Sequence, residues 1–253
     1  MKYFFALLFI CASFFQTQAE ENPKLTEAEA AFESKNFQNA IVLYTELIES
    51  KEISDCSYVF FKRGFSYYYL ANYKAAKADF KTALKVSPEN KNYNYIRGAS
   101  YWTYGRIYSK LNKPSKAVKL LLKSKEYLQS SDLYSTLGYN EIKLKKYKDA
   151  LAHLDIAISG DNKNAYAYNN RALVYIKLNQ LDKAREDVEQ SKLLNNRNPY
   201  VFKHSALIYI QLKKYDMACM ELQKAKDLGY ADFLGGHEAD RNEVDHLMNT
   251  YCR

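Results

Sequence analysis

One short pattern recurs six times along the chain, and it limits the possible folds more than any other feature. Each copy has an alanine followed four residues later by a large apolar residue. The six pairs are Ala40 with Tyr44, Ala76 with Phe80, Ala117 with Leu121, Ala150 with Leu154, Ala184 with Val188, and Ala218 with Leu222. Most copies begin 33 to 36 residues after the one before, as the positions of the alanines show. Such a period is typical of proteins in which one repeated unit stacks on the next.

A second small residue stands twelve positions before each alanine. These residues are Ala28, Gly64, Gly105, Gly138, Ala172 and Ala206. A residue with little or no side chain lets a second helix approach closely, so we expect the alanine to face it across a helix pair. We expect the large apolar residue to fill the gap to the next repeat. One unit alone would expose its apolar face, and stacking would bury it.

These positions carry a resemblance to a known family. Four copies also have a tyrosine three residues after the small residue, at Tyr67, Tyr108, Tyr175 and Tyr209. The pattern resembles the tetratricopeptide repeat (TPR), a helix–turn–helix unit of about 34 residues, over roughly residues 24–230. The resemblance implies an all-α fold, a right-handed α-solenoid of about six helix pairs with a C-terminal capping helix. An irregular helical bundle is the alternative, but it would not explain near-constant spacing.

The resemblance also predicts the boundaries of the parts. We expect an array over 20–230, with repeats near 24–55, 57–91, 98–130, 131–164, 165–198 and 199–230, and a cap in 231–253. The second and third alanines, Ala76 and Ala117, are more widely spaced than the others. This spacing predicts about seven extra residues around 90–98, and the turn over 49–56 is expected to be longer by about two residues.

The N-terminal residues 1–19 have the composition of a secretory signal peptide. Lys2 supplies a positive charge, Tyr3 to Phe15 is almost continuously apolar, and small residues precede a possible cleavage after Ala19. The apolar run is shorter than the roughly 20 residues that span a bilayer. We therefore expect export to a bacterial periplasm or to the medium, which the resemblance of the chain's ending to exported bacterial TPR proteins also favours. A buried N-terminal helix and a lipid anchor at Cys11 are the alternatives.

Cysteine usage agrees with an oxidising compartment. Four cysteines are present, and Cys11 would leave with the signal peptide. The remaining three allow at most one internal disulfide. We prefer Cys219 with Cys252, because the last repeat should contact the cap. Cys56 would then be a lone thiol, buried between helices.

No pattern in the chain predicts catalysis or a cofactor. His153 and His204 stand alone in different repeats, and His237 and His246 do not match a zinc spacing. There is no glycine-rich phosphate loop and no nucleophile elbow. The net charge of +8 comes from lysines scattered among acids, so nucleic-acid binding is not predicted. We expect no enzyme, no metal and no cofactor.

The family resemblance predicts where a partner would bind. In TPR proteins the first helices of the repeats line a concave groove. The corresponding residues here are Tyr58, Phe61, Phe65, Tyr68, Trp102, Arg106, Tyr139, Tyr166, Asn169, Asn170, Leu173, Lys177, Tyr200, Lys203 and Leu207. We interpret them as an aromatic groove with Lys, Arg and Asn as hydrogen-bond donors. The alternative for any one aromatic residue is packing between repeats.

Function follows from the groove and the predicted export. One TPR subfamily clamps the terminal carboxylates of chaperones, and Asn169 to Arg171 partly fit it. Tyr200 and His204 stand where that clamp needs cations, so we do not infer this function. We expect a non-enzymatic scaffold or adaptor that binds a protein or peptide in the cell envelope or outside the cell, without spanning a membrane. The alternative is a module that binds glycan or peptidoglycan through the aromatic groove.

Overall fold

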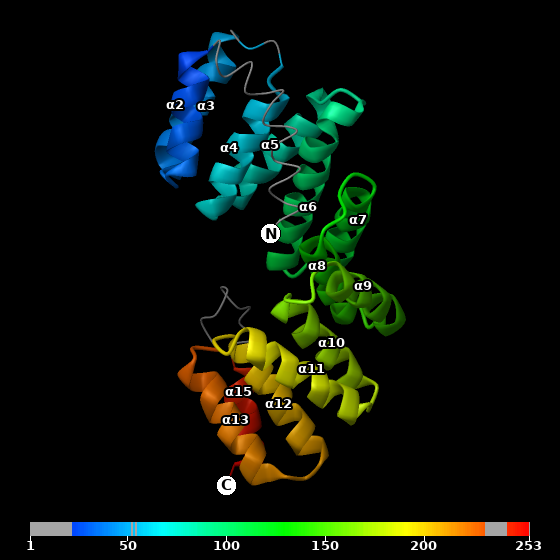
Figure 1. Cartoon of the computed structure of the whole chain (residues 1–253). Helices are drawn as coiled ribbons and strands as arrows, with labels where there is room; N and C mark the ends of the chain where they lie inside the picture. The colour runs from blue at the N-terminus through cyan, green and yellow to red at the C-terminus, as the bar shows by residue number, and fades with distance from the viewer. Residues whose placement is uncertain (1–21, 52, 54, 231–241, 253) are drawn as a thin grey trace. The chain divides into compact units, whose positions relative to one another are not determined.

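A computed structural model describes residues 22–51, Ile53, residues 55–230 and residues 242–252 (Figure 1). Within these residues the chain has thirteen α-helices and one 3-10 helix and no strand, so the predicted all-α fold is confirmed. The predicted signal peptide at 1–19, Cys11 and His237 lie outside the described residues.

The chain divides into two compact units, one ending at Leu133 and the other beginning at Tyr134. The helices of the first unit are α2 (Pro23–Glu33), α3 (Phe37–Ser50), α4 (Ser57–Tyr69), α5 (Tyr73–Val86), the 3-10 helix η1 (Lys91–Tyr93), α6 (Asn94–Lys110) and α7 (Pro114–Lys125). Helix α8 (Ser131–Lys143) begins at the boundary. The second unit continues with α9 (Tyr147–Gly160), α10 (Ala165–Lys177), α11 (Leu181–Leu194), α12 (Pro199–Gln211), α13 (Tyr215–Asp227) and α15 (Glu243–Tyr251).

The same turn joins the two helices of each pair. Its key residue has a left-handed backbone and stands five positions before the repeat alanine, at Lys35, Ala71, Asn112, Lys145, Asn179 and Lys213. The next residue donates its N–H to a carbonyl five positions back, as from Asn72 to Tyr67 at 2.9 Å. This bond ends the first helix in a Schellman motif. The turn therefore follows the same spacing as the alanines.

Ala71 provides a first test of this turn. Its φ of 57° is unfavourable for a residue with a Cβ, by about 1–2 kcal/mol. Ala71→Gly should remove that strain and so stabilise the fold. Part of this stabilisation is offset because glycine gives the unfolded chain more conformational freedom. We expect the free energy of unfolding, measured by urea denaturation, to rise by about 0.5–1 kcal/mol. The control Ala75→Gly, inside helix α5, should lower it by about 1 kcal/mol. Equal losses in both variants would contradict the strained turn.

The large apolar residue of each repeat is completely buried. Tyr44, Phe80, Leu121, Leu154, Val188 and Leu222 each expose at most 1% of their surface. A Cβ added to Gly138 would lie 2.6 Å from Leu154 Cγ. The large residue, and not the alanine alone, therefore packs on the small residue of its own repeat. Leu154 also shares a cluster with Ala167 of the next repeat, so the predicted contact between repeats is confirmed.

The extra residues predicted around 90–98 form helix rather than a loose loop. Helix η1 and the first turn of α6 precede Gly98. A Cβ on Gly98 would lie 2.4 Å from Leu128 Cγ, so glycine is needed for this close approach. Tyr93 donates its hydroxyl to Asp55, which ties the insertion to the turn before α4. The insertion is therefore a fixed part of the first unit.

Helix α15 covers the end of the second unit. Its Val244 lies in one cluster with Ala206 and Leu222. The structure places Cys219 and Cys252 close enough for the predicted disulfide, with Cα atoms 5.6 Å apart. Cys56 differs from the prediction, because it stands partly exposed at the start of α4 rather than between helices.

Candidate functional site

In the first unit the predicted groove residues on α4 share one side of the helix, since they are spaced by three or four residues. Phe61 and Tyr68 are buried, whereas Tyr58 and Phe65 are partly exposed. Phe61 packs edge-to-face on Phe65, with ring centroids 5.0 Å apart. The hydroxyl of Tyr58 donates to Glu29 Oε1 at 2.5 Å. This side of α4 is therefore partly core and partly surface.

Helix α6 adds Trp102 and Arg106 to the same unit. The guanidinium carbon of Arg106 lies 5.2 Å from the centroid of the Tyr68 ring and 5.5 Å from that of Trp102. Such cation–π contacts stabilise by about 0.5–1 kcal/mol at exposed sites. Trp102 exposes only 8% of its surface, so its main contacts lie within the unit. Arg106 remains partly exposed and is the better candidate for contact with a partner.

In the second unit, some predicted groove residues are bound to other parts of the unit. Lys203 is buried, and its Nζ donates to Glu243 Oε2 of the capping helix at 2.9 Å. Tyr230 donates to the same oxygen at 3.1 Å. The rings of Tyr200 and Tyr230 pack with centroids 4.8 Å apart. Lys203 and Tyr200 therefore hold the cap in place.

Asn169 is also bound within the unit. Its Oδ1 accepts a hydrogen bond from His204 Nδ1 at 2.8 Å, and both residues are buried. The neighbouring Arg171 pairs with both oxygens of Asp187 at 2.8 Å and with Asp155 at 2.7 Å. Its hydrogen bonds to Asp187 raise the pKa of Arg171 further above its ordinary value. The polar groups of Asn169 and Arg171 are thus bound within the unit and do not form a carboxylate clamp.

The other predicted residues of the second unit stay on the surface. Tyr166 exposes 44% of its surface, and Lys177 on the same helix is exposed. Three residues between and beside them are partly exposed: Asn170, Leu173 and Leu207. Tyr139 is partly exposed and lies under Lys143, whose Nζ is 5.2 Å from its ring centroid. We call Tyr139, Tyr166, Asn170, Leu173, Lys177 and Leu207 the unit 2 face, and Tyr58, Phe65 and Arg106 the unit 1 face.

Ionisable groups beneath the cap have shifted pKa values. Burial lowers the pKa of His204 well below its ordinary value, and the charge of Lys203 lowers it further. Burial alone would raise the pKa of Glu243, but the charge of Lys203 and the hydrogen bonds from Lys203 and Tyr230 lower it instead. The folded unit therefore holds a neutral imidazole beside an ionised pair.

His204 should make the second unit sensitive to acid. The unfolded chain protonates this histidine below about pH 6.5, whereas the folded unit keeps it neutral. Over that range the unfolded state binds more protons. The free energy of unfolding therefore decreases as the pH is lowered, by up to about 1.4 kcal/mol per pH unit. Urea denaturation between about pH 7 and pH 5 should show a smaller fall for His204→Gln than for the parent chain. The exposed His246→Gln should leave the fall unchanged. Parallel pH curves for all three proteins would refute a neutral buried His204.

Arg–Asp pairs are a feature that the sequence reasoning missed. Arg63 pairs with both oxygens of Asp79 at 2.8 Å, as Arg171 does with Asp187, and each pair is sixteen residues apart. The signal was present in the sequence, because each arginine precedes the small residue and each aspartate follows the alanine by three positions. These pairs link the two helices of a repeat.

Between residues 22 and 252, apart from the segments left undescribed, there is no cluster of three or more possible metal ligands. None of the helices in the described part of the chain has the length and hydrophobicity needed to cross a membrane.

The helix pairs, the shared turn and the small-on-large packing define a repeat protein of the α-solenoid class. A comparison with protein families matches the tetratricopeptide repeat to residues 61–121 and again to residues 165–198. The chain contains tetratricopeptide repeats within these residues.

Known relatives agree with this family. A TPR repeat-containing protein of Methanocaldococcus jannaschii is 26% identical over 63% of this chain, and the Hsp70-Hsp90 organizing protein of Triticum aestivum is 27% identical over 64%. The chain spans 27% and 33% of the lengths of these two relatives.

Solved structures show the same fold. YrrB, described as a TPR protein with an unusual peptide-binding site, has a TM-score of 0.57 at 18% identity, over 81% of this chain and 97% of its own. The C-terminal part of a TPR repeat-containing protein from Cytophaga hutchinsonii has a TM-score of 0.61 at 17% identity, over 90% and 87%. At such identities the likeness concerns the fold alone.

Proposed function

We propose that this chain is a non-enzymatic scaffold whose unit 1 and unit 2 faces bind a protein or peptide. The observation that carries the proposal is the mixture of exposed aromatic and cationic side chains that packing leaves on the first helices, above all Tyr166 with Lys177 and Arg106. Tyr and Arg are enriched where protein interfaces gain most of their energy. The peptide-binding site named for YrrB and the partner proteins named for the organizing protein support this proposal.

The test should avoid residues that hold the fold. Trp102, Asn169 and Lys203 are buried, so changing them would weaken the units themselves. Tyr166→Ala with Lys177→Ala removes two exposed contacts from one helix and leaves the core intact. The matched control is Ile156→Ala with Lys148→Ala on helix α9, where both side chains are exposed.

Partners should first be captured from cell-envelope extract by the parent chain and then measured as purified proteins. We expect the double change on the unit 2 face to weaken binding at least about tenfold, since interface anchors contribute about 1–2 kcal/mol each or more. The control pair should bind like the parent. Equal affinity of the two double variants for every captured protein would reject the unit 2 face. Retention on purified peptidoglycan, lost in the face variant, would instead support the glycan alternative.

The proposed setting is the cell envelope or the medium. It is supported by the signal-like composition of residues 1–19 and by the closeness of Cys219 and Cys252. N-terminal sequencing of the protein from its own cells should give Glu20 as the first residue. An intact Met1 on cytosolic protein would reject export.

A further inference from the structure

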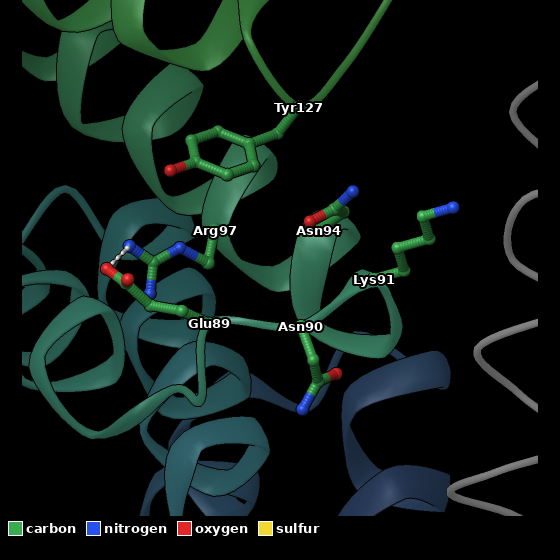
Figure 2. Close-up of a pocket in the computed structure, with 6 residues that line it drawn as sticks. All are labelled: Glu89, Asn90, Lys91, Asn94, Arg97 and Tyr127. Carbon is green, nitrogen blue, oxygen red and sulfur yellow. Dashed lines mark hydrogen bonds and ion pairs between the residues drawn. The ribbon is translucent and has the colours of Figure 1, made fainter.

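The insertion before α6 builds a polar pocket of about 290 Å³ in the first unit (Figure 2). Its lining residues are Glu89, Asn90, Lys91, Asn94, Arg97 and Tyr127. None of them belongs to the unit 1 face. In repeat proteins, insertions into single repeats often lie on a binding face. This insertion is also well anchored, through Tyr93 and Gly98, so its pocket is preformed.

Arg97 is the fixed charge of the pocket. It exposes only 8% of its surface, and its Nη1 donates to the carbonyl oxygen of Ser87 at 3.0 Å. Its guanidinium carbon lies 5.4 Å from the centroid of the Tyr127 ring. A guanidinium has five N–H donors in a planar fork that matches the two oxygens of a carboxylate. Holding the fork by Ser87 and Tyr127 reduces the entropy that a ligand would have to remove.

Glu89 already places a carboxylate at this guanidinium, although loosely. Its Oε1 lies 3.4 Å from Arg97 Nη2, longer than the usual 2.7–2.9 Å for such charged pairs. Its side chain is 87% exposed, so little else holds it there. Figure 2 shows Arg97 between Tyr127 and Glu89, with Asn94 and the exposed Lys91 on the other side of the pocket. A carboxylate from outside could therefore replace Glu89 at Arg97, while Lys91, whose side chain points away from Arg97 in Figure 2, adds a positive charge at the rim of the pocket.

We propose that this pocket binds an acidic side chain, Glu or Asp, of a partner peptide, with Arg97 as the fixed donor and Lys91 as the second cation. The positive net charge of the chain, +8, favours acidic partners in general. An acidic sugar would need open aromatic surface for stacking. Tyr127 already packs against Arg97 and also against Tyr101, with ring centroids 6.1 Å apart, which favours the peptide.

The probe is the blocked tetrapeptide acetyl-Gly-Glu-Glu-Gly-amide, titrated into the full chain while NMR follows the side-chain Nε–H signal of Arg97. We expect a saturable shift with this peptide and none with the isosteric acetyl-Gly-Gln-Gln-Gly-amide. Glucuronate, as a sugar carboxylate, should bind more weakly than the Glu peptide. A Glu peptide without a saturable shift, or glucuronate that binds more tightly, would overturn the proposal. Because none of the pocket residues lies on the unit 1 or unit 2 face, this result is independent of the proposed scaffold function.

Two charge changes with opposite expected signs complete the test. Lys91→Glu should weaken binding of the Glu peptide about threefold to tenfold, and Glu89→Gln should tighten it about threefold, by removing the internal competitor. The controls Lys81→Glu and Glu27→Gln make the same charge changes at exposed positions outside the pocket and should have smaller effects. Loss of folding cannot produce tighter binding. Equal effects at Lys91 and Lys81, or no tightening in Glu89→Gln, would refute the site.

Discussion

Phe80→Ala should lower the free energy of unfolding of the first unit by about 3–5 kcal/mol. Phe80 has no exposed surface and fills the space that Gly64 leaves open, where an added Cβ would lie 3.1 Å from the ring. Its ring also packs edge-to-face on Phe65, with centroids 5.3 Å apart. Removal of the ring leaves a cavity at the junction of α4 and α5. Chemical denaturation followed by circular dichroism measures the loss.

The matched control for Phe80→Ala lies on the same helix. Val86→Ala removes apolar atoms from a side chain that is 44% exposed and should change stability by no more than about 0.5 kcal/mol. A second variant, Phe80→Leu, places in this repeat the residue that packs on Gly105 and Gly138 in others, and it should restore much of the loss. Similar denaturation midpoints for Phe80→Ala and Val86→Ala would show that the small-on-large contact is not the core of the repeat.

Loss of the predicted Cys219–Cys252 bridge should be the other large effect. The two cysteines are 33 residues apart in sequence, and closure of such a loop stabilises a fold by about 3–4 kcal/mol in the chain-entropy model. Cys252→Ser should therefore loosen α15, so that its backbone amides exchange with deuterium faster than those of α12. Under native conditions, non-reducing peptide mapping should recover the linked pair.

Cys56 offers the internal control for the bridge. Burial and the nearby Asp55 raise the pKa of its thiol, so Cys56 should react slowly with iodoacetamide near neutral pH. Cys56→Ser should leave the exchange of α15 unchanged. Rapid alkylation of Cys219 and Cys252 without a reductant, or unaltered α15 exchange in Cys252→Ser, would show that the bridge does not hold the cap.

The repeating part of this fold could be predicted from sequence because the same contact, a large apolar residue on a small one, recurs along the chain. The spacing of alanines and small residues correctly predicts an all-α fold of helix pairs, and the buried Phe80 and Leu154 confirm contacts that follow from it. The left-handed turn was not predicted, because Lys35, Ala71 and Lys145 are not residues that favour this conformation.

The candidate site was harder to predict than the fold. Helical periodicity places Lys203 and Tyr166 on corresponding sides of α12 and α10, yet Lys203 is buried and Tyr166 is exposed. Lys203 is bound to Glu243, forty residues further along the chain, whose position depends on how the cap docks. Periodicity within one helix carries no information about such a distant partner. The assignment of the two faces to ligand binding therefore stays a prediction.

The six left-handed turn residues also give a way to tune stability without touching the candidate binding surfaces. All six are exposed, none is glycine, and each lies in a different repeat. Glycine replacements there should act nearly independently. Combining them would give a series of variants with graded melting temperatures. The binding of a surface variant could then be compared with that of a turn variant of equal melting temperature. This comparison would show whether weaker binding comes from a lost contact or from partial unfolding.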